Sequence, residues 1–204
     1  MKKKNGDIIW VQISSRVLHD KNDKPYYEGI VRDITEQKST LNKIEYLSFH
    51  DKLTGLYNRT YFDEELKRVD NKRQHPVSIV FGDMNGLKKV NDRYGHLEGD
   101  HLLREMARIL KLCFRSEDIV ARWGGDEFII ILPRTNVEIA NKIIGRIKKR
   151  SRQLRSRKHT LSIAPGASTR SDSKQDFESV IKEAENRMYL DKEKSRHYNQ
   201  VIFN

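Results

Sequence analysis

Apolar side chains recur at three- and four-residue spacing through much of the chain. Leu102, Met106, Ile109 and Cys113 fall on one face of the stretch around them, as expected for an amphipathic helix. Patterns of this kind predict helices over four ranges: Thr35–His50, Glu98–Phe114, Val137–Arg150 and Phe177–Lys194. Shorter apolar runs bounded by turn residues predict strands over seven ranges: Asp7–Leu18, Tyr26–Val31, Val77–Asp83, Asp118–Trp123, Phe128–Leu132, His159–Ile163 and Gln200–Phe203.

The order of these elements indicates the fold class. The first two strands follow each other across turn residues and are expected to pair antiparallel. The remainder reads βαββαβ with an extra terminal strand, which predicts an α+β domain with an antiparallel-centred sheet and helices mostly on one face. Ferredoxin-like cores and polymerase palms share this order. Pro165 cannot donate a ladder hydrogen bond, so the strand near it is expected to end early or to contain a bulge.

Carboxylates stand at the ends of two predicted strands. Gly124 and Gly125 allow a tight hairpin turn, and the adjacent Asp126 and Glu127 add negative charge that the turn does not need. Asp83 ends another strand and by itself would more often cap a helix. Carboxylate and carbonyl oxygens suit Mg²⁺, so convergence of these groups at one sheet edge predicts a metal site.

Composition narrows the class of protein. The 204 residues suffice for one main domain, and the net charge of +11 favours anionic partners without choosing among them. The single cysteine, Cys113, excludes a disulfide within the chain. Since no apolar run approaches a bilayer span and no hydrophobic signal region is present, we expect this fragment to be cytoplasmic and without membrane contact. A membrane tether elsewhere in a longer parent protein stays compatible with this expectation.

Four motifs follow one another along the chain. The stretch Ala121–Phe128, reading ARWGGDEF, resembles the signature of the GGDEF family, the diguanylate cyclases. Asp51–Arg59, reading DKLTGLYNR, resembles the junction that opens these domains, after which a new helix is expected near Tyr61. Asp83–Asp100 and Ala184–His197 resemble the family's phosphate-loop and C-terminal patterns. The resemblance covers nearly all of the chain.

The resemblance implies a reaction and its metal ligands. The 3′-hydroxyl of one GTP attacks the α-phosphate of another, and the step is repeated to give cyclic di-GMP and two pyrophosphates. Asp83, the carbonyl of Met84 and Asp126 match the metal ligands, and Glu127 matches the carboxylate that holds a second ion and helps to deprotonate the hydroxyl. Two Mg²⁺ per active site are implied, with Mn²⁺ as a substitute. Each protomer carries one GTP half-site, so a homodimer is required and monomers should be inactive.

The resemblance also assigns binding residues. Asn91 and Asp100 match the positions that read guanine, and loop amides after Asp83 match the cradle for the β- and γ-phosphates. The complete substrate-binding set is Gly86, Leu87, Lys88, Asn91, Asp100, Gly125, Lys192 and Arg196. Arg115 and Asp118 match the family's RxxD inhibitory motif, which implies feedback by cyclic di-GMP. Departures from the family pattern occur at Asn85, Gly86, Leu87, Arg187, Asp191 and Ser195, and none removes an implied metal ligand.

The N-terminal part resembles a different family. Gly29–Lys38 is similar to the last strand of a PAS sensor domain and its exit into a signalling helix, although only the back half of such a domain is present. We therefore expect the end of a PAS domain at residues 1–34, a linker helix at 35–50 and a GGDEF domain at 51–204. The apolar stripe of Leu41, Ile44 and Leu47 suits either a twin helix or the helix's own domain.

Two rival functions remain open from the residues. A catalytically inactive GGDEF domain could act as a receptor that binds cyclic di-GMP through Arg115 and Asp118, although the intact Gly124–Phe128 motif argues against this alternative. A basic nucleic-acid-binding module with a palm-like fold would show strongly salt-dependent binding and no GTP turnover. The cyclase reading predicts GTP and cyclic di-GMP as ligands and no nucleic-acid partner.

Overall fold

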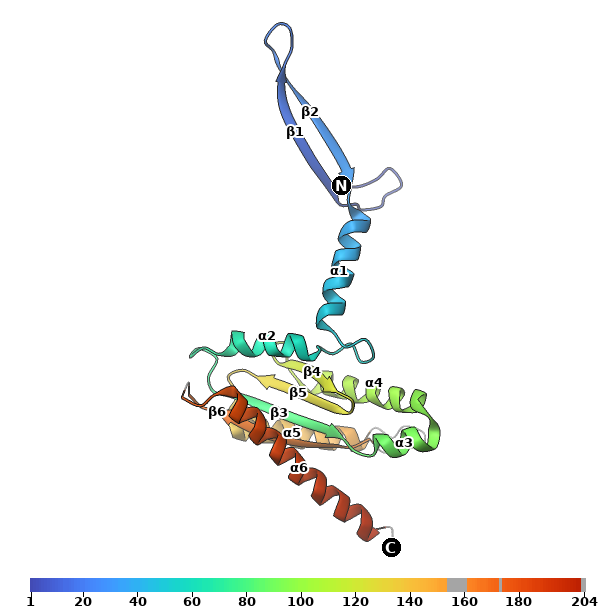
Figure 1. The fold of residues 1–204 in the computed structure, drawn as a ribbon, viewed down its shortest axis with the longest axis vertical. Coiled ribbons are helices and arrows are strands. Elements are labelled where there is room, and N and C mark those ends of the chain that lie inside the picture. The colour runs from blue at the N-terminus through green and yellow to red at the C-terminus, as the bar shows by residue number, and fades with distance from the viewer. Residues whose placement is uncertain (154–160, 173, 203–204) are drawn as a thin grey trace. The chain divides into compact units, whose positions relative to one another are not determined.

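The computed structural model describes residues 1–153, 161–172 and 174–202, with side chains described as far as Ser195 in the last helix. The chain divides into two compact units, Met1–Ser48 and Phe49–Asn204 (Figure 1). Among the described residues, no helix combines the length and apolar composition needed to cross a bilayer.

The N-terminal unit is a β-hairpin followed by a helix, as predicted. Strands β1 (Val11–His19) and β2 (Pro25–Asp33) pair antiparallel, and helix α1 (Thr35–Phe49) follows directly. The pairing places apolar residues opposite one another on one face of the hairpin, where they are exposed: Ile13, Val17, Tyr27 and Val31. The hairpin thus presents an apolar face within this unit.

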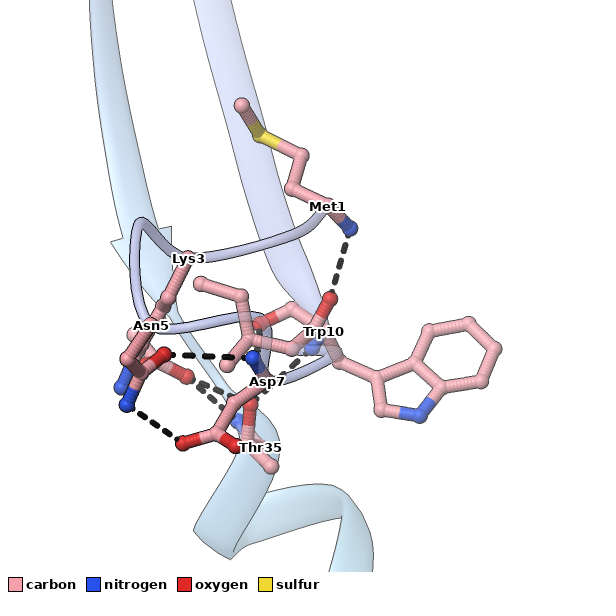
Figure 2. Close-up of polar contacts among 8 residues, drawn as sticks. Met1, Lys3, Asn5, Asp7, Trp10 and Thr35 are labelled. Atoms are coloured by element: carbon pink, nitrogen blue, oxygen red, sulfur yellow. Dashed lines mark hydrogen bonds and ion pairs between the residues drawn. The ribbon is translucent and has the colours of Figure 1, made fainter.

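Hydrogen bonds join the start of the hairpin to the start of α1 (Figure 2). The backbone N–H of Trp10 donates to Thr35 Oγ1 over 3.0 Å, and that hydroxyl donates to Asp33 Oδ1 over 2.6 Å. Lys3 Nζ lies 3.1 Å from the other Asp33 oxygen. The hydrogen bonds from Thr35, and then the contact with Lys3, lower the pKa of Asp33 to about 2. Thr35 therefore fixes the point where the chain turns from strand into helix.

The second unit contains a four-stranded antiparallel sheet in the order β4-β5-β3-β6. Its elements in chain order are α2 (Arg59–Val69), β3 (Val77–Met84), α3 (Leu87–Tyr94), α4 (His96–Cys113), β4 (Ile119–Gly124), β5 (Glu127–Leu132), α5 (Val137–Gln153), β6 (Ile163–Arg170) and α6 (Phe177–Ile202). Strand β3 is buried at every position. The predicted βαββαβ order and α+β, palm-like fold are confirmed.

Helices cover both faces of this sheet, so the expectation that they lie mostly on one face was wrong. Val80 and Ile130 belong to one apolar cluster together with residues of α4 and α5. Ile79, Phe81 and Ile129 belong to a second cluster with residues of α2 and α6. Because successive residues of a strand point to opposite faces, the continuous apolar runs in β3 and β5 supply both clusters.

Two strand predictions near the C-terminus are also corrected. Strand β6 starts at Ile163, later than predicted, and keeps an unbroken register against β3 with Pro165 opposite Gly82. It is an edge strand of the described sheet, a position where the missing N–H of proline is tolerated. Residues 200–202, predicted as strand, continue α6, and no glycine or proline interrupts the chain from Phe177 onward. Residues 159, 160 and 203 lie outside the described part.

Candidate active site

The turn between β4 and β5 lies beside the end of β3. Gly125 has a φ of +49°, a conformation that favours glycine. Asp83 in β3 is paired in register with Glu127 in β5, and the N–H of Met84 donates to the carbonyl of Asp126 over 2.9 Å. The sheet therefore brings the three predicted carboxylate residues and Met84 to one end.

Lys192 reaches this end of the sheet from α6. Its Nζ lies 2.5 Å from Asp83 Oδ2, and the Asp83 side chain is only 7% exposed. Burial raises the pKa of Glu127, and the negative charges of Asp83, Asp126 and Glu185 raise it further, while Lys192 acts in the opposite direction. The carboxylates thus repel one another, and a lysine partly compensates.

The donor chemistry of this cluster suits a hard divalent cation. Carboxylate oxygens, with the neighbouring carbonyl of Met84, are ligands that Mg²⁺ prefers, and mutual repulsion among Asp83, Asp126 and Glu127 favours a bound cation. Within the described ranges, no group of three His, Cys, Asp or Glu side chains is arranged to hold a metal ion. Oxygen donors thus lie together at this end of the sheet, but their assignment as a set of metal ligands stays a proposal.

The loop after β3 turns sharply into α3. Gly86 is left-handed, with φ +76°, and among the described side chains none caps the first turn of the helix. Asn85, one of the departures from the family pattern, donates from its backbone N–H to the carbonyl of Ser162 over 2.9 Å and from Nδ2 to Ser162 Oγ over 3.2 Å. Leu87 is buried and Lys88 exposed. Asn85 thus ties this loop to the segment that precedes β6.

Asn91 and Asp100 lie on α3 and α4, which pack together. Asn91 Oδ1 is buried without a hydrogen-bond partner in the part of the chain that the structure describes. A Cβ on Gly99 would lie 1.9 Å from this oxygen, so only glycine leaves room for the Asn91 side chain. The close approach of Asn91 to Gly99 therefore brings the Asn91 side chain near Asp100, the next residue on α4.

Arg115 and Asp118 form the turn between α4 and β4. The backbone N–H of Arg115 donates to Asp118 Oδ2 over 2.8 Å, and burial raises the pKa of Asp118. The Arg115 guanidinium is exposed and lies 3.9 Å from Glu117. Both residues line a cavity of about 220 Å³ whose other walls include His50, Tyr57, Lys111 and Phe114. The turn therefore borders a small cavity with a cationic side chain at its edge.

Arg122 holds the glycine turn, a role that the sequence motifs did not indicate. Its Nε and Nη2 donate to the carbonyl of Gly125 over 3.1 and 2.8 Å, and its Nη1 lies 3.1 Å from Asp51 Oδ1. Burial raises the pKa of Asp51, but hydrogen bonds from Thr54 and Arg122 lower it overall. Asp51 and Arg122 both lie in motifs that resemble the family's. Their presence in these motifs was the available sequence signal for a role at the glycine turn.

The predicted phosphate pair is only partly described. Lys192 lies on α6 and contacts Asp83, whereas the side chain of Arg196, one turn later, lies outside the described residues. The other predicted residues are placed around the β3 end and the helices that follow it: Asp83, Met84, Gly86, Leu87, Lys88, Asn91, Asp100, Gly125, Asp126 and Glu127. Arg115 and Asp118 lie at the separate turn after α4.

Comparison with known proteins identifies the family. Residues 48–198 match the family described as "Diguanylate cyclase, GGDEF domain". In Escherichia coli K12, the probable diguanylate cyclase DgcE is 34% identical over 82% of this chain and 16% of its own length, and the cyclic di-GMP phosphodiesterase PdeR is 32% identical over 80% and 25%. The chain thus spans a quarter or less of either relative.

A solved structure supports the fold. The coiled coil and GGDEF domain of DgcB from Caulobacter crescentus, in complex with c-di-GMP, superposes with a TM-score of 0.72 at 24% identity, covering 78% of this chain and 88% of that one. The family match covers most of the second unit, and the superposition agrees with it in fold. The chain belongs to the GGDEF diguanylate cyclase family.

Proposed function

We propose that the second unit is a diguanylate cyclase that condenses two GTP molecules into cyclic di-GMP and two pyrophosphates. The observation that carries this proposal is the cluster of Asp83, Asp126 and Glu127 at the glycine turn, where strand register joins β3 to β5. Carboxylates that repel one another at one end of the sheet destabilise the fold, so fold stability alone does not explain their presence.

The carboxylates have distinct proposed roles. Asp83, the Met84 carbonyl and Asp126 would hold one Mg²⁺ and Glu127 a second, with Mn²⁺ as a substitute. Charge neutralisation at the α-phosphate is the chemistry that these ions supply when bound. Glu127, whose pKa is raised by burial and neighbouring charge, would accept the proton of the 3′-hydroxyl. Arg122 keeps the turn that carries Asp126 in place.

The substrate is held by the elements around this cluster. The uncapped first turn of α3, at Gly86 to Lys88, supports binding of the β- and γ-phosphates. The buried Asn91 Oδ1 and the Asp100 carboxylate can accept from the N1 and N2 hydrogens of guanine, which adenine lacks. Gly125 keeps the turn open to the nucleotide, and Lys192 and Arg196 contribute positive charge for the phosphates.

A comparison of GTP with ATP tests this assignment. Purified protein stripped of nucleotide should release pyrophosphate from GTP in the presence of Mg²⁺ and should release at most a trace from ATP. Equal release from both nucleotides would contradict the guanine-reading roles of Asn91 and Asp100.

Gly99→Ala tests the guanine contact separately. The new methyl group must displace the Asn91 side chain, since its carbon would fall 1.9 Å from Oδ1. Loss of one or two hydrogen bonds should weaken binding of a non-hydrolysable GTP analogue by about tenfold. Calorimetric titration measures this, with Gly145→Ala as the control. A Cβ added to that helical glycine would meet no described atom within 4 Å beyond its own stretch of helix. Unchanged affinity in Gly99→Ala would exclude the proposed role of Asn91.

The active form is proposed to be a homodimer, since each protomer supplies one half-site. The stripe of Leu41, Ile44 and Leu47 on α1 supports this, because all three are at least 40% exposed. The unit before α1 is proposed to be the end of a PAS domain, residues 1–34, joined by the linker helix 35–50 to the cyclase domain 51–204. The exposed apolar face of the β1–β2 hairpin supports this proposal, because such a face would pack against the rest of a PAS domain.

Product feedback is proposed at the turn after α4. Arg115 offers an exposed guanidinium for phosphate or a guanine edge, and Asp118 borders the same cavity. Arg115→Ala should therefore raise the cyclic di-GMP concentration that halves the rate by about tenfold or more. The initial rate without product should stay within about twofold, since the residue lies apart from the carboxylate cluster.

Inhibition curves with added cyclic di-GMP measure this effect. Glu117→Ala is the matched control, because its side chain is exposed at the same turn and is not part of the RxxD pair. If Arg115→Ala were inhibited as strongly as the parent, feedback through this turn would be excluded.

A further inference from the structure

The contact between Lys192 and Asp83 joins residues 109 positions apart in the sequence. The ammonium lies 2.5 Å from Asp83 Oδ2, and the side chains are 21% and 7% exposed, respectively. A lysine expected to bind phosphate therefore contacts the carboxylate that is proposed to bind the metal. The two proposed roles of these residues cannot both be fulfilled in this arrangement.

The surroundings explain why a cation is favourable at this position. Asp83, Asp126 and Glu185 all act on Glu127 as negative charges, and Lys192 acts on it as a positive charge. A buried carboxylate deprived of its counter-charge is strongly unfavourable. A divalent ion and an ammonium would relieve the same repulsion, so they compete for one carboxylate.

We propose that Lys192 is an exchangeable internal counter-ion, which neutralises Asp83 before substrate arrives and leaves it when a divalent cation binds there with the nucleotide. The released ammonium then binds the phosphates. This inference rests on the proposed function, because it takes Asp83 as a metal ligand. It adds that metal must displace Lys192, so the protein without nucleotide binds a free metal ion weakly.

The exchange predicts opposite effects of one substitution on two ligands. In Lys192→Met the competing charge is gone, and binding of free Mn²⁺ should tighten by about tenfold. Binding of a non-hydrolysable GTP analogue with Mg²⁺ should weaken, because a phosphate contact is lost. A residue that only binds phosphate would leave the affinity for free Mn²⁺ unchanged, and a purely structural residue would weaken both.

The test is a titration of nucleotide-free protein with Mn²⁺, followed by electron paramagnetic resonance of the unbound ion. The parent, Lys192→Met and Lys194→Met are compared, since Lys194 is an exposed lysine on the same helix. Tighter Mn²⁺ binding in Lys192→Met alone supports the exchange. Equal or weaker binding in Lys192→Met, or the same gain in Lys194→Met, overturns it.

Thermal unfolding supplies a second readout. In EDTA, Lys192→Met should unfold at a lower temperature than the parent, and Mn²⁺ should raise its midpoint by more than that of the parent. Lys192→Gln replaces the methionine variant if the latter does not fold. Absence of Mn²⁺ binding in every protein, including the parent, would overturn both the metal assignment and the exchange. A parent that binds Mn²⁺ and makes product while Lys192→Met gains no affinity would overturn the exchange alone.

Discussion

Replacing Glu127 with glutamine should lower the rate of cyclic di-GMP formation by at least about 100-fold, the usual contribution of a general base. Glutamine keeps the shape of the side chain but cannot accept the proton of the 3′-hydroxyl. The variant should still bind the GTP analogue, because the proposed phosphate and guanine contacts lie on α3, α4 and α6. Product formation is measured by chromatography, with the exposed Glu64→Gln on α2 as the control. A Glu127→Gln rate close to that of the parent would remove Glu127 from the mechanism.

The same substitution should stabilise the fold at neutral pH. The folded-state pKa of Glu127 is raised above its ordinary value by burial and by neighbouring carboxylates. For such a group, stability falls as pH rises through the folded pKa, so the ionised Glu127 is a destabilising charge at pH 7. Glu127→Gln should therefore unfold at a higher temperature than the parent at pH 7 in EDTA. The difference should shrink as the pH falls through the folded-state pKa and vanish below the ordinary glutamate pKa. A difference independent of pH would contradict the assigned charge repulsion.

Gly166→Ala should be the most destabilising single-methyl change in the β6–α6 contact. A Cβ on Gly166 would lie 2.2 Å from the carbonyl oxygen of Ala184 and from the backbone nitrogen of Met188. These are backbone atoms of α6, which cannot turn aside as a side chain can. Separation of α6 from β6 should lower the free energy of unfolding by about 3 kcal/mol.

Urea unfolding measures the loss, with Gly145→Ala as the control. That exposed glycine lies inside α5, where alanine should stabilise the helix by up to about 1 kcal/mol. Because Lys192 lies on α6, Gly166→Ala should also weaken GTP binding. Parental stability in Gly166→Ala would show that β6 and α6 do not pack as closely as described.

Local patterns predicted most of the elements but not how they pack. Helix α4 and the β4–β5 hairpin were predicted correctly. Their signals are local: the apolar stripe that includes Leu102 and Met106, and the turn at Gly124 and Gly125. Periodicity shows that a helix has an apolar face but not which sheet face it covers. The continuous apolar run in β3 was the signal for burial on both sides, and it was not used.

The candidate site was predictable where motifs carry it and unpredictable where distant residues meet. Asp83 and Glu127 were each recognised, but their pairing depends on strand register, which the sequence pattern does not define alone. The contacts of Lys192 with Asp83 and of Arg122 with Asp51 join residues far apart in the chain. Such ion pairs depend on how α6 and the segment before α2 pack in the fold. The spacing of residues along the sequence does not predict that packing.

The most direct test of cyclase activity is product identification by mass spectrometry. Protein stripped of nucleotide is incubated with GTP and Mg²⁺ at several protein concentrations. We expect cyclic di-GMP with two pyrophosphates for each molecule formed, and a specific activity that rises with protein concentration as dimers form. No cyclic di-GMP at any concentration, from protein that still binds cyclic di-GMP, would contradict the proposed cyclase activity and identify a receptor instead.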